Sequence, residues 1–211
     1  MRRLMSVLSV GLLGTCAALA QQDIVSFTGL GGNQAINGNY TLGYEFSVTS
    51  PITVSALSDF ASGVASGGTA VGLWNASGTE IASTAVTPSD LLTSDGYFRY
   101  SLLSSAITLQ DGDYFVGAYA PSGTAYSSGV TGLTAVSGVS YLGSDYSRAS
   151  GLQDPTTPVS SSLYLFGGNV VLASAVSFGD ADPVVPDAGS GMMLLSAGLA
   201  GLAAFGRKKL L

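Results

Sequence analysis

Carboxylates are the side chains in this sequence that could carry out acid–base chemistry. Two of them on opposite sides of a groove are enough to hydrolyse a glycosidic bond, one as the acid and the other as the base or nucleophile. Seven are spread over the middle of the chain: Glu45, Asp59, Glu80, Asp90, Asp95, Asp111 and Asp113. Their spacing singles out no pair, so a carboxylate-pair glycoside hydrolase is an alternative that the sequence does not favour.

Other common catalytic residue types are missing. The 211 residues include no histidine, and both lysines, Lys208 and Lys209, lie near the C-terminal end. A Ser-His-Asp triad, a Cys-His dyad and a histidine-ligated metal are therefore excluded. A serine in the middle of the chain would also have no lysine to act as its base. We expect a protein that is not an enzyme and that uses no cofactor.

Asp111 and Asp113, on either side of Gly112, are the candidates for a metal site. Calcium prefers hard oxygen ligands, which two carboxylates and the carbonyl groups of a loop supply. The same Asp-Gly-Asp sequence is also typical of a polar turn, and a strand signal follows it at Tyr114. We expect the turn, with calcium binding as the alternative.

Aromatic residues offer another kind of site, a face on which sugars stack. The candidates are Trp74, Tyr97, Tyr100, Tyr119, Tyr141 and Tyr146. Because such a ring buries about 150–250 Å² in a core, we expect most of them inside the domain. Arg148 lies two residues after Tyr146 and is, with Arg99, one of two cations between the terminal segments. Exposed aromatics with a nearby cation suit a ligand, so Trp74, Tyr146 and Arg148 are the candidate contacts.

The charge of the chain restricts its partners. Residues 21–206 contain two basic and thirteen acidic residues, so their net charge is −11. Such a domain repels nucleic-acid phosphates and anionic lipid headgroups, and we expect no nucleic-acid partner. Charged residues make up only 9% of the whole chain, against about a quarter in ordinary proteins. This composition is typical of a β-rich extracellular module.

Short strand signals bounded by Gly, Ser, Asp or Pro recur through the middle of the chain. They cover residues 24–28, 42–49, 52–59, 70–75, 80–86, 97–103, 106–109, 114–120, 139–142, 163–166 and 170–173. No window keeps a helical period. We therefore expect residues 21–179 to form one all-β domain, an antiparallel β-sandwich of jelly-roll type. Gly- and Ser-rich stretches predict loops at residues 62–68, 121–138 and 143–162, and residues 180–187 predict a linker.

Residues 1–20 have the layout of a secretory signal peptide. Arg2 and Arg3 precede a short apolar run, and Ala18 and Ala20 form an A-x-A cleavage site before Gln21. The only cysteine, Cys16, lies inside this segment. The exported domain is therefore expected to contain no thiol and no disulfide.

Residues 188–211 predict a hydrophobic helix with a basic tail. The stretch 188–205 is uncharged, and as a helix its 18 residues would be about 27 Å long, enough for a thin hydrocarbon core. Arg207, Lys208 and Lys209 follow as a basic stop that stays on the cytoplasmic side. The domain between the two ends is then expected outside the inner membrane. A permanent membrane anchor is the alternative to a segment that is cleaved.

The C-terminal segment resembles the PEP-CTERM class of sorting signals. Three features carry the resemblance: the apolar stretch, the basic end, and the preceding motif Val185-Pro186-Asp187-Ala188-Gly189-Ser190. The closest variant begins Val-Pro-Asp-Ser-Gly, so Ala188 replaces its serine, and Asp187 stands where the commoner Pro-Glu-Pro motif has glutamate. The resemblance implies that an exosortase-like membrane protease cuts near this motif and passes the protein to the cell surface or matrix.

The middle of the chain resembles a β-sandwich module of unknown function that recurs in PEP-CTERM proteins. The resemblance covers residues 42–172 and rests on Gly43-Tyr44-Glu45-Phe46-Ser47-Val48, Val71-Gly72-Leu73-Trp74, Gly96-Tyr97-Phe98-Arg99-Tyr100, Gly112-Asp113-Tyr114-Phe115-Val116-Gly117-Ala118-Tyr119, Tyr141-Leu142-Gly143-Ser144 and Phe166-Gly167-Gly168-Asn169. It implies the fold and an extracellular location, and it supplies no catalytic residues.

The leading hypothesis is therefore a non-enzymatic exported protein of the cell surface or extracellular matrix. It would be anchored transiently in the inner membrane by its C-terminal helix, sorted by the exosortase-like protease and associated with exopolysaccharide. A carbohydrate-binding module that uses exposed Tyr or Trp is the first alternative, and the carboxylate-pair glycoside hydrolase is the second.

Overall fold

The computed structural model describes residues 21–159 and 167–173. The chain divides into two units, Met1–Ser174 and Ala175–Leu211, and the described residues all belong to the first. Every regular element among them is a strand, and every pairing is antiparallel, which confirms the expected all-β class. No helix in this part of the chain is long and apolar enough to cross a membrane. The predicted signal peptide, linker and C-terminal helix lie outside the described residues.

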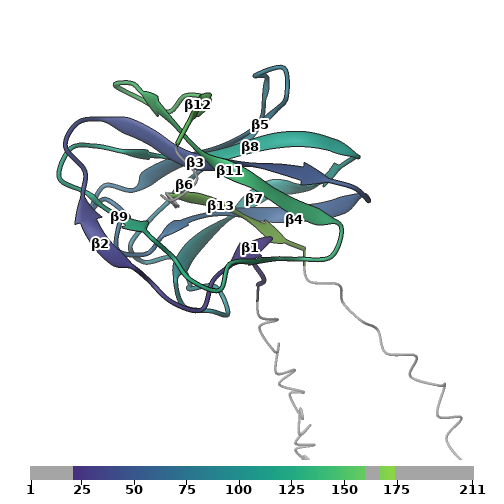
Figure 1. Ribbon diagram of the computed structural model, residues 1–211, viewed down its shortest axis with the longest axis horizontal. Helices are drawn as coiled ribbons and strands as arrows, with labels where there is room; N and C mark the ends of the chain where they lie inside the picture. The colour runs from purple at the N-terminus through teal and green to yellow at the C-terminus, as the bar shows by residue number, and fades with distance from the viewer. Residues whose placement is uncertain (1–20, 160–166, 174–211) are drawn as a thin grey trace, which may run out of the picture. The chain divides into compact units, whose positions relative to one another are not determined.

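Two sheets form the domain (Figure 1). The larger has six strands in the order β12-β11-β3-β8-β5-β6, with bounds Thr157–Pro158, Val139–Arg148, Tyr40–Val48, Gly112–Ala120, Thr69–Asn75 and Glu80–Val86. The smaller has the order β13-β4-β7, with bounds Gly168–Leu172, Ile52–Phe60 and Phe98–Leu109. Two short pairs complete the fold: β1 (Val25–Ser26) with β10 (Thr134–Ala135), and β2 (Gly32–Ala35) with β9 (Ala125–Ser128).

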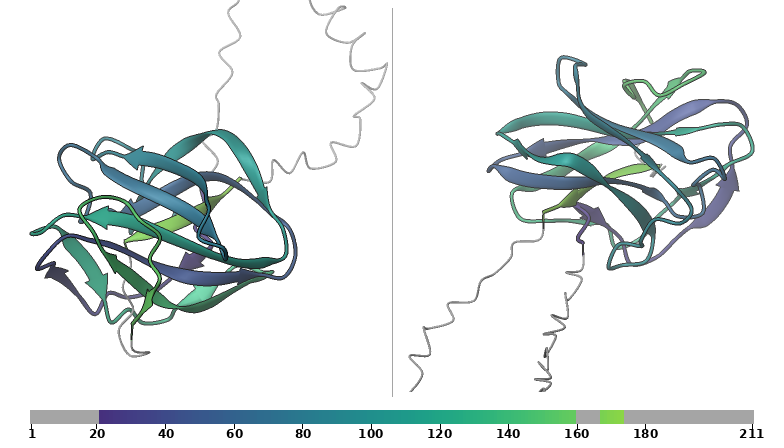
Figure 2. Two further views of the ribbon diagram at one scale, coloured as in Figure 1. Left: turned by 90° about the horizontal axis from the view of Figure 1, so that it is seen from above. Right: turned by 180° about the vertical axis from the view of Figure 1, so that it is seen from behind.

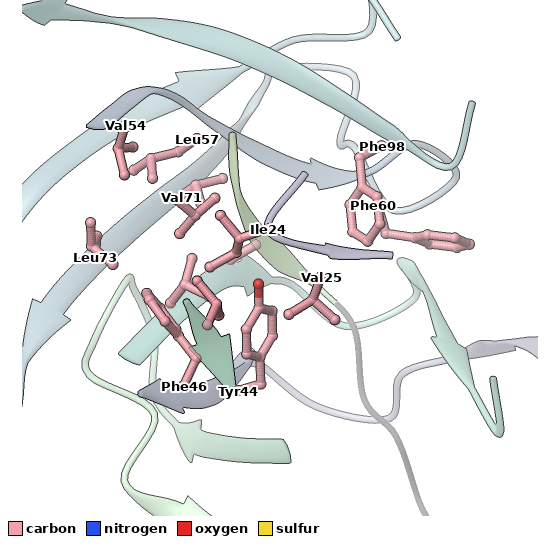
Figure 3. Close-up of a cluster of buried hydrophobic side chains, with 14 of the residues drawn as sticks. Ile24, Val25, Tyr44, Phe46, Val54, Leu57, Phe60, Val71, Leu73 and Phe98 are labelled. Atoms are coloured by element: carbon pink, nitrogen blue, oxygen red, sulfur yellow. The ribbon is translucent and has the colours of Figure 1, made fainter. Parts of the chain in front are cut away.

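Figures 1 and 2 show the two sheets as facing layers, and the hydrophobic core consists of side chains from both of them. On β3, Tyr44, Phe46 and Val48 are buried on one face, as their alternation predicts. Val54 and Leu57 on β4 belong to the same hydrophobic cluster (Figure 3). Full burial of one such side chain stabilises the fold by about 1.5–3 kcal/mol, so this alternation decides which face of each sheet turns inward.

Most strand signals coincide with strands of the structure, with differences in three regions. The strand at Glu80–Val86 is found as expected, whereas the two signals over residues 97–109 form one strand, β7. The expectation of uninterrupted loops at 121–138 and 143–162 is wrong: these stretches contain β9, β10, β12 and the second half of β11. The register of β11 shifts between Tyr141 and Gly143, so Leu142 forms a bulge that breaks the alternation there. The signal at 163–166 lies outside the described residues.

A row of three glycines crosses the outer face of the larger sheet. Gly43 on β3 is opposite Gly117 on β8, which is opposite Gly72 on β5. A Cβ atom at residue 117 would lie 3.2 Å from Pro155 Cγ, and one at residue 72 would lie 3.1 Å from Leu152 Cδ2. The missing side chains therefore let the segment that follows β11 pack directly on the sheet, on its way to β12.

The first and last described residues of the domain lie beside each other. Leu172 N donates a hydrogen bond to the carbonyl of Gln22, and Ile24 N donates to the carbonyl of Val170, at 2.9 and 2.8 Å. The residues entering the domain thus cover the free edge of β13, the strand from which the chain leaves it. An edge strand closed in this way presents fewer unpaired backbone groups to other chains.

Candidate functional site

A cleft of about 400 Å³, here called the tyrosine cleft, opens at one end of the larger sheet. It is lined by three tyrosines, Tyr40, Tyr126 and Tyr146, together with Ala35, Ile36, Asn37, Leu42 and Val159. The volume falls in the range of about 300–1,000 Å³ that is usual for small-ligand sites, and the lining of aromatic and aliphatic groups with few polar ones is also typical of them.

Strand register positions the tyrosines. Tyr40 and Leu42 on β3 are opposite Arg148 and Tyr146 on β11. Side chains directly opposite in an antiparallel pair project from the same face, so these four share the face of Tyr44. The core ends at Leu42, which is buried, whereas Tyr40 and Tyr146 are half-buried. The opposite wall comes from the β2–β9 pair, whose backbone pairing holds Tyr126 at the cleft.

Contacts between the side chains fix one wall of the cleft. The rings of Tyr40 and Tyr146 meet edge to face, with centroids 5.9 Å apart and an interplanar angle of 64°. The guanidinium carbon of Arg148 lies 6.0 Å from the centroid of the Tyr40 ring. Both arrangements are attractive, because the ring face is electron-rich and the ring edge and the guanidinium are positive. Tyr40 is therefore held from two sides while it remains partly exposed.

A second hollow of about 440 Å³ adjoins the first and is polar. Its lining consists of Gly38, Asn39, Ser122, Arg148, Ala149 and Ser150. Asn39 Oδ1 accepts a hydrogen bond of 2.9 Å from Ser122 N, and the Asn39 carbonyl accepts one of 3.3 Å from Ala149 N. These bonds tie three chain segments together around Arg148. The Arg148–Tyr40 contact thus separates an aromatic hollow from a polar one.

Two of the three predicted ligand contacts, Tyr146 and Arg148, lie at this site. The expectation that Trp74 is an exposed contact is wrong. Its side chain is 4% exposed, and a Cβ atom at Gly72 would lie 2.5 Å from Trp74 Cη2. The indole therefore packs over Gly72 on the outer face, away from the cleft, because a residue without a side chain leaves room for a flat ring.

Tyr40 and Tyr126 were not among the sequence candidates. Tyr40 precedes the strand signal at residues 42–49, and Tyr126 falls in a stretch predicted to be a loop. Each becomes a site residue only through pairing with a strand far away in the sequence. The local signal available was the frequency of tyrosine, ten in 211 residues, which does not say which rings meet.

The carboxylates lie elsewhere. Asp111 is exposed in the turn between β7 and β8, and Asp113 is exposed at the start of β8. Within residues 21–159 and 167–173, no three His, Cys, Asp or Glu side chains come together as a set of metal ligands. The charge of Asp113 does help to raise the pKa of Glu45 on β3, but these carboxylates do not form a cluster of three potential metal ligands in this part of the chain. No Asp or Glu is among the described residues that line the tyrosine cleft or the polar hollow.

Asp145, which is not among the seven carboxylates considered from the sequence, also has a raised pKa. Burial raises its pKa from 3.8 to about 6, and the charge of the neighbouring Glu45 contributes a smaller part of this rise. The two residues lie on neighbouring strands, with Asp145 opposite Gly43 and Glu45 opposite Gly143. They therefore share the outer face of the sheet, on the side opposite Tyr146. This pair is separated from the cleft by the sheet itself.

Comparison with known proteins gives one match. The family model described as Domain of unknown function (DUF4082) matches residues 31–165, a range that includes Tyr40, Tyr126, Tyr146 and Arg148. No curated protein and no solved structure matches the chain.

Proposed function

Since the chain belongs to the family described as Domain of unknown function (DUF4082), we propose from its geometry that it is a non-enzymatic, carbohydrate-binding protein of the bacterial cell surface or extracellular matrix. The tyrosine cleft is the observation that carries the proposal. Three tyrosines from three strands line one open cleft over a domain whose other large apolar side chains are mostly buried.

Tyrosines suit sugars for a physical reason. A pyranose ring has an apolar C–H face and hydroxyls around its rim, and a tyrosine offers an apolar ring with a hydroxyl at its end. Tyr40 and Tyr146 meet edge to face, so each presents part of a ring face to the cleft at a fixed angle. Asn37 and the tyrosine hydroxyls supply polar groups that fix the orientation of a bound sugar.

Binding without hydrolysis is favoured by the residues that line the cleft. Glycoside hydrolysis requires two carboxyl groups on either side of the scissile bond. The Asp145 and Glu45 carboxyls belong to the other face of the sheet, which the segment containing Leu152 and Pro155 covers. A sugar in the tyrosine cleft would therefore have no acid or nucleophile beside it among the described residues.

The proposal also includes export and sorting. Residues 1–20 would direct secretion, and residues 188–211 would hold the protein in the inner membrane until an exosortase-like protease cuts near Val185–Ser190. Two features of the domain support this: the described residues contain no cysteine, and the positions where the chain enters and leaves the domain are adjacent. Adjacent ends allow both terminal segments to reach one membrane without distorting the domain.

Glycan-array binding tests the carbohydrate proposal. The full chain is purified in a detergent without a sugar headgroup, so that the detergent does not compete for the cleft. We expect binding to a defined set of glycans, at least about tenfold weaker for Tyr146→Ala, which removes one stacking ring. Tyr119→Ala is the matched control, since Tyr119 is half-buried on β8 and does not line the cleft. Failure of every glycan to bind, or equal binding by Tyr146→Ala and the unchanged chain, would overturn the proposal.

Sorting is tested separately by mass. The intact mass of protein extracted from the cell surface should correspond to a chain that begins near Gln21 and ends near residue 190. Deletion of residues 188–211 should leave the protein in the medium or periplasm. Surface protein of full length, or unchanged surface display after the deletion, would contradict the sorting part of the proposal and leave glycan binding unaffected.

A further inference from the structure

We propose that the glycan is anionic, and that Arg148 binds a carboxylate or sulfate on the sugar next to the one in the tyrosine cleft. The inference rests on the proposed carbohydrate binding and adds the chemical class of the ligand. It comes from the position of one cation between two hollows of different polarity.

Arg148 is exposed at the boundary of the two hollows. Its guanidinium stacks at 6.0 Å over Tyr40, a wall of the tyrosine cleft, and its side chain lines the polar hollow. No described residue forms an ion pair with it. A guanidinium in a cation–π contact still has N–H donors for another partner, and these match the two oxygens of a carboxylate or sulfate.

Arg148 is a rare positive charge in an acidic domain. The described residues contain ten acidic and two basic side chains, a net charge of −8. The other cation, Arg99, uses its Nη1 to donate to the carbonyl of Asp90 on the far side of the fold from β11. Repulsion of an anionic chain by distant carboxylates is screened over about 10 Å at 0.1 M salt, whereas a direct contact with Arg148 is screened much less. Local attraction therefore decides where an anionic glycan binds.

The two hollows are the right size to hold neighbouring sugars. Their volumes are about 400 and 440 Å³, and the Tyr40–Arg148 stack forms the wall between them. One sugar would stack on Tyr40 and Tyr146, while the next would place its anionic group against Arg148. In the polar hollow, Asn39 and Ser122 supply hydrogen-bonding groups for the hydroxyls of the second sugar.

The test compares one oligosaccharide as the charged free acid and as the neutral methyl ester, with a sulfated sugar as a second anion. The full chain is titrated calorimetrically with tetragalacturonate, with the same oligosaccharide in fully methyl-esterified form, and with a sulfated tetrasaccharide. We expect the free acid to bind about tenfold more tightly than its methyl ester, and this ratio to shrink as salt is raised. Comparison of the free acid with the sulfated sugar shows which anionic group Arg148 prefers.

Variants separate this inference from the proposed function. Arg148→Gln should weaken binding of the acidic ligand to the level of the methyl ester without changing the ester, and Arg148→Lys should restore part of the difference. Arg99→Gln removes the same charge elsewhere and should leave the ratio unchanged. If the ester and the acid bind equally, or if Arg148→Gln weakens the binding of both alike, the inference of an anionic glycan is wrong. The proposal of carbohydrate binding is then unaffected. If neither binds, and the glycan array is also negative, carbohydrate binding itself fails.

Discussion

The hydroxyl of Tyr44 donates a hydrogen bond to Asn169 Oδ1 inside the core and thereby joins the two sheets. Asn169 Nδ2 in turn donates to the carbonyl of Val25 at 2.7 Å, and Asn169 Oδ1 also accepts from Val170 N at 2.8 Å. Figure 3 shows the Tyr44 hydroxyl directed into the space between Ile24 and Val25. One buried amide thus connects β3, β13 and the segment that enters the domain.

Replacement of Asn169 should destabilise the domain more than replacement of Tyr44. Asn169→Ala leaves the Val25 carbonyl and the Tyr44 hydroxyl without this partner, and each buried polar group that loses its partner costs about 1–3 kcal/mol. Tyr44→Phe removes a hydroxyl while Asn169 keeps its bonds to Val25 and Val170, so we expect a loss of about 1 kcal/mol. Urea unfolding of the two variants measures both values. Equal losses would show that Asn169 does not connect the three segments.

The same pair shows how far local pattern predicts the fold. That Tyr44 points inward follows from its alternation with Phe46 and Val48, because burial of an apolar face sets the parity of a strand. That it meets Asn169 does not follow, since 125 residues separate the two and strand order is decided by packing of the whole chain. β2 and the second half of β11 contain Gly, Asn and Ser and give no strand signal in the sequence. They form strands because they pair with β9 and β3, and not because their residues have a high strand propensity.

The site was predictable only in part. Tyr146 and Arg148 are near each other in the sequence, so their shared surface position could be anticipated. Tyr40 lies opposite Arg148 through a register between residues more than 100 positions apart, which no local signal encodes. Trp74 failed as a site residue because its indole is buried against Gly72 on the outer face of the sheet, a packing that the local sequence does not reveal.

Within the glycine row, Gly117 is the position where an added side chain would meet the segment around Pro155, whereas a Cβ atom at Gly43 would clash with the backbone of Val116. A Cβ atom at residue 117 would lie 2.7 Å from Thr41 Cγ2 and 3.2 Å from Pro155 Cγ, both closer than normal contact. Gly117→Val should therefore displace the segment around Pro155 and lower the free energy of unfolding by about 1–3 kcal/mol. Gly143→Ala on β11, a strand of the same sheet, is the matched control, because nothing lies within 4 Å of its Cβ position. Urea unfolding should leave that control within about 0.5 kcal/mol of the unchanged protein. Indistinguishable curves for the two variants would mean that the segment does not rest on the row.

Trp74 is expected to stabilise the fold and to make no contact with a bound glycan. Trp74→Ala should destabilise the domain by about 3–5 kcal/mol, because the side chain is 4% exposed and packs over Gly72. Circular dichroism is the appropriate probe, since the substitution removes the only tryptophan. At a temperature where it remains folded, the variant should bind glycans as the unchanged protein does. Trp74→Phe, which keeps a flat ring, should lose less stability. Loss of glycan binding in a folded Trp74→Phe variant would contradict this assignment.

Asp59 gives the domain an unusual dependence on pH. The side chain is 3% exposed and its Oδ2 atom has no hydrogen-bond partner. Burial raises its pKa from 3.8 to about 7, and hydrogen bonds from Thr69 and the Phe60 backbone only partly oppose this. Burial also raises the pKa of Asp23, to which the charge of Asp95 adds. At neutral pH these groups cost stability, because the folded state disfavours their charged forms.

Acidification from pH 8 to pH 5 should therefore stabilise the domain. Between pH 4 and pH 7 folded Asp59 binds a proton that the unfolded chain has lost, so the free energy of unfolding falls as pH rises through this window and levels off above it. Between pH 5 and pH 8 this shift corresponds to a change in the free energy of unfolding on the order of 3 kcal/mol. Urea unfolding at pH 5 and pH 8, followed by the fluorescence of Trp74, measures the difference.

The Asp59→Asn variant is the control, because its side chain is uncharged at both pH values. It should show a smaller difference in stability between pH 5 and pH 8. Asp23 and Asp145 should supply the remainder, since burial raises the pKa of each. A protein that is more stable at pH 8 than at pH 5, or an Asp59→Asn variant with the full pH dependence of the unchanged chain, would show that Asp59 is not buried as a neutral acid.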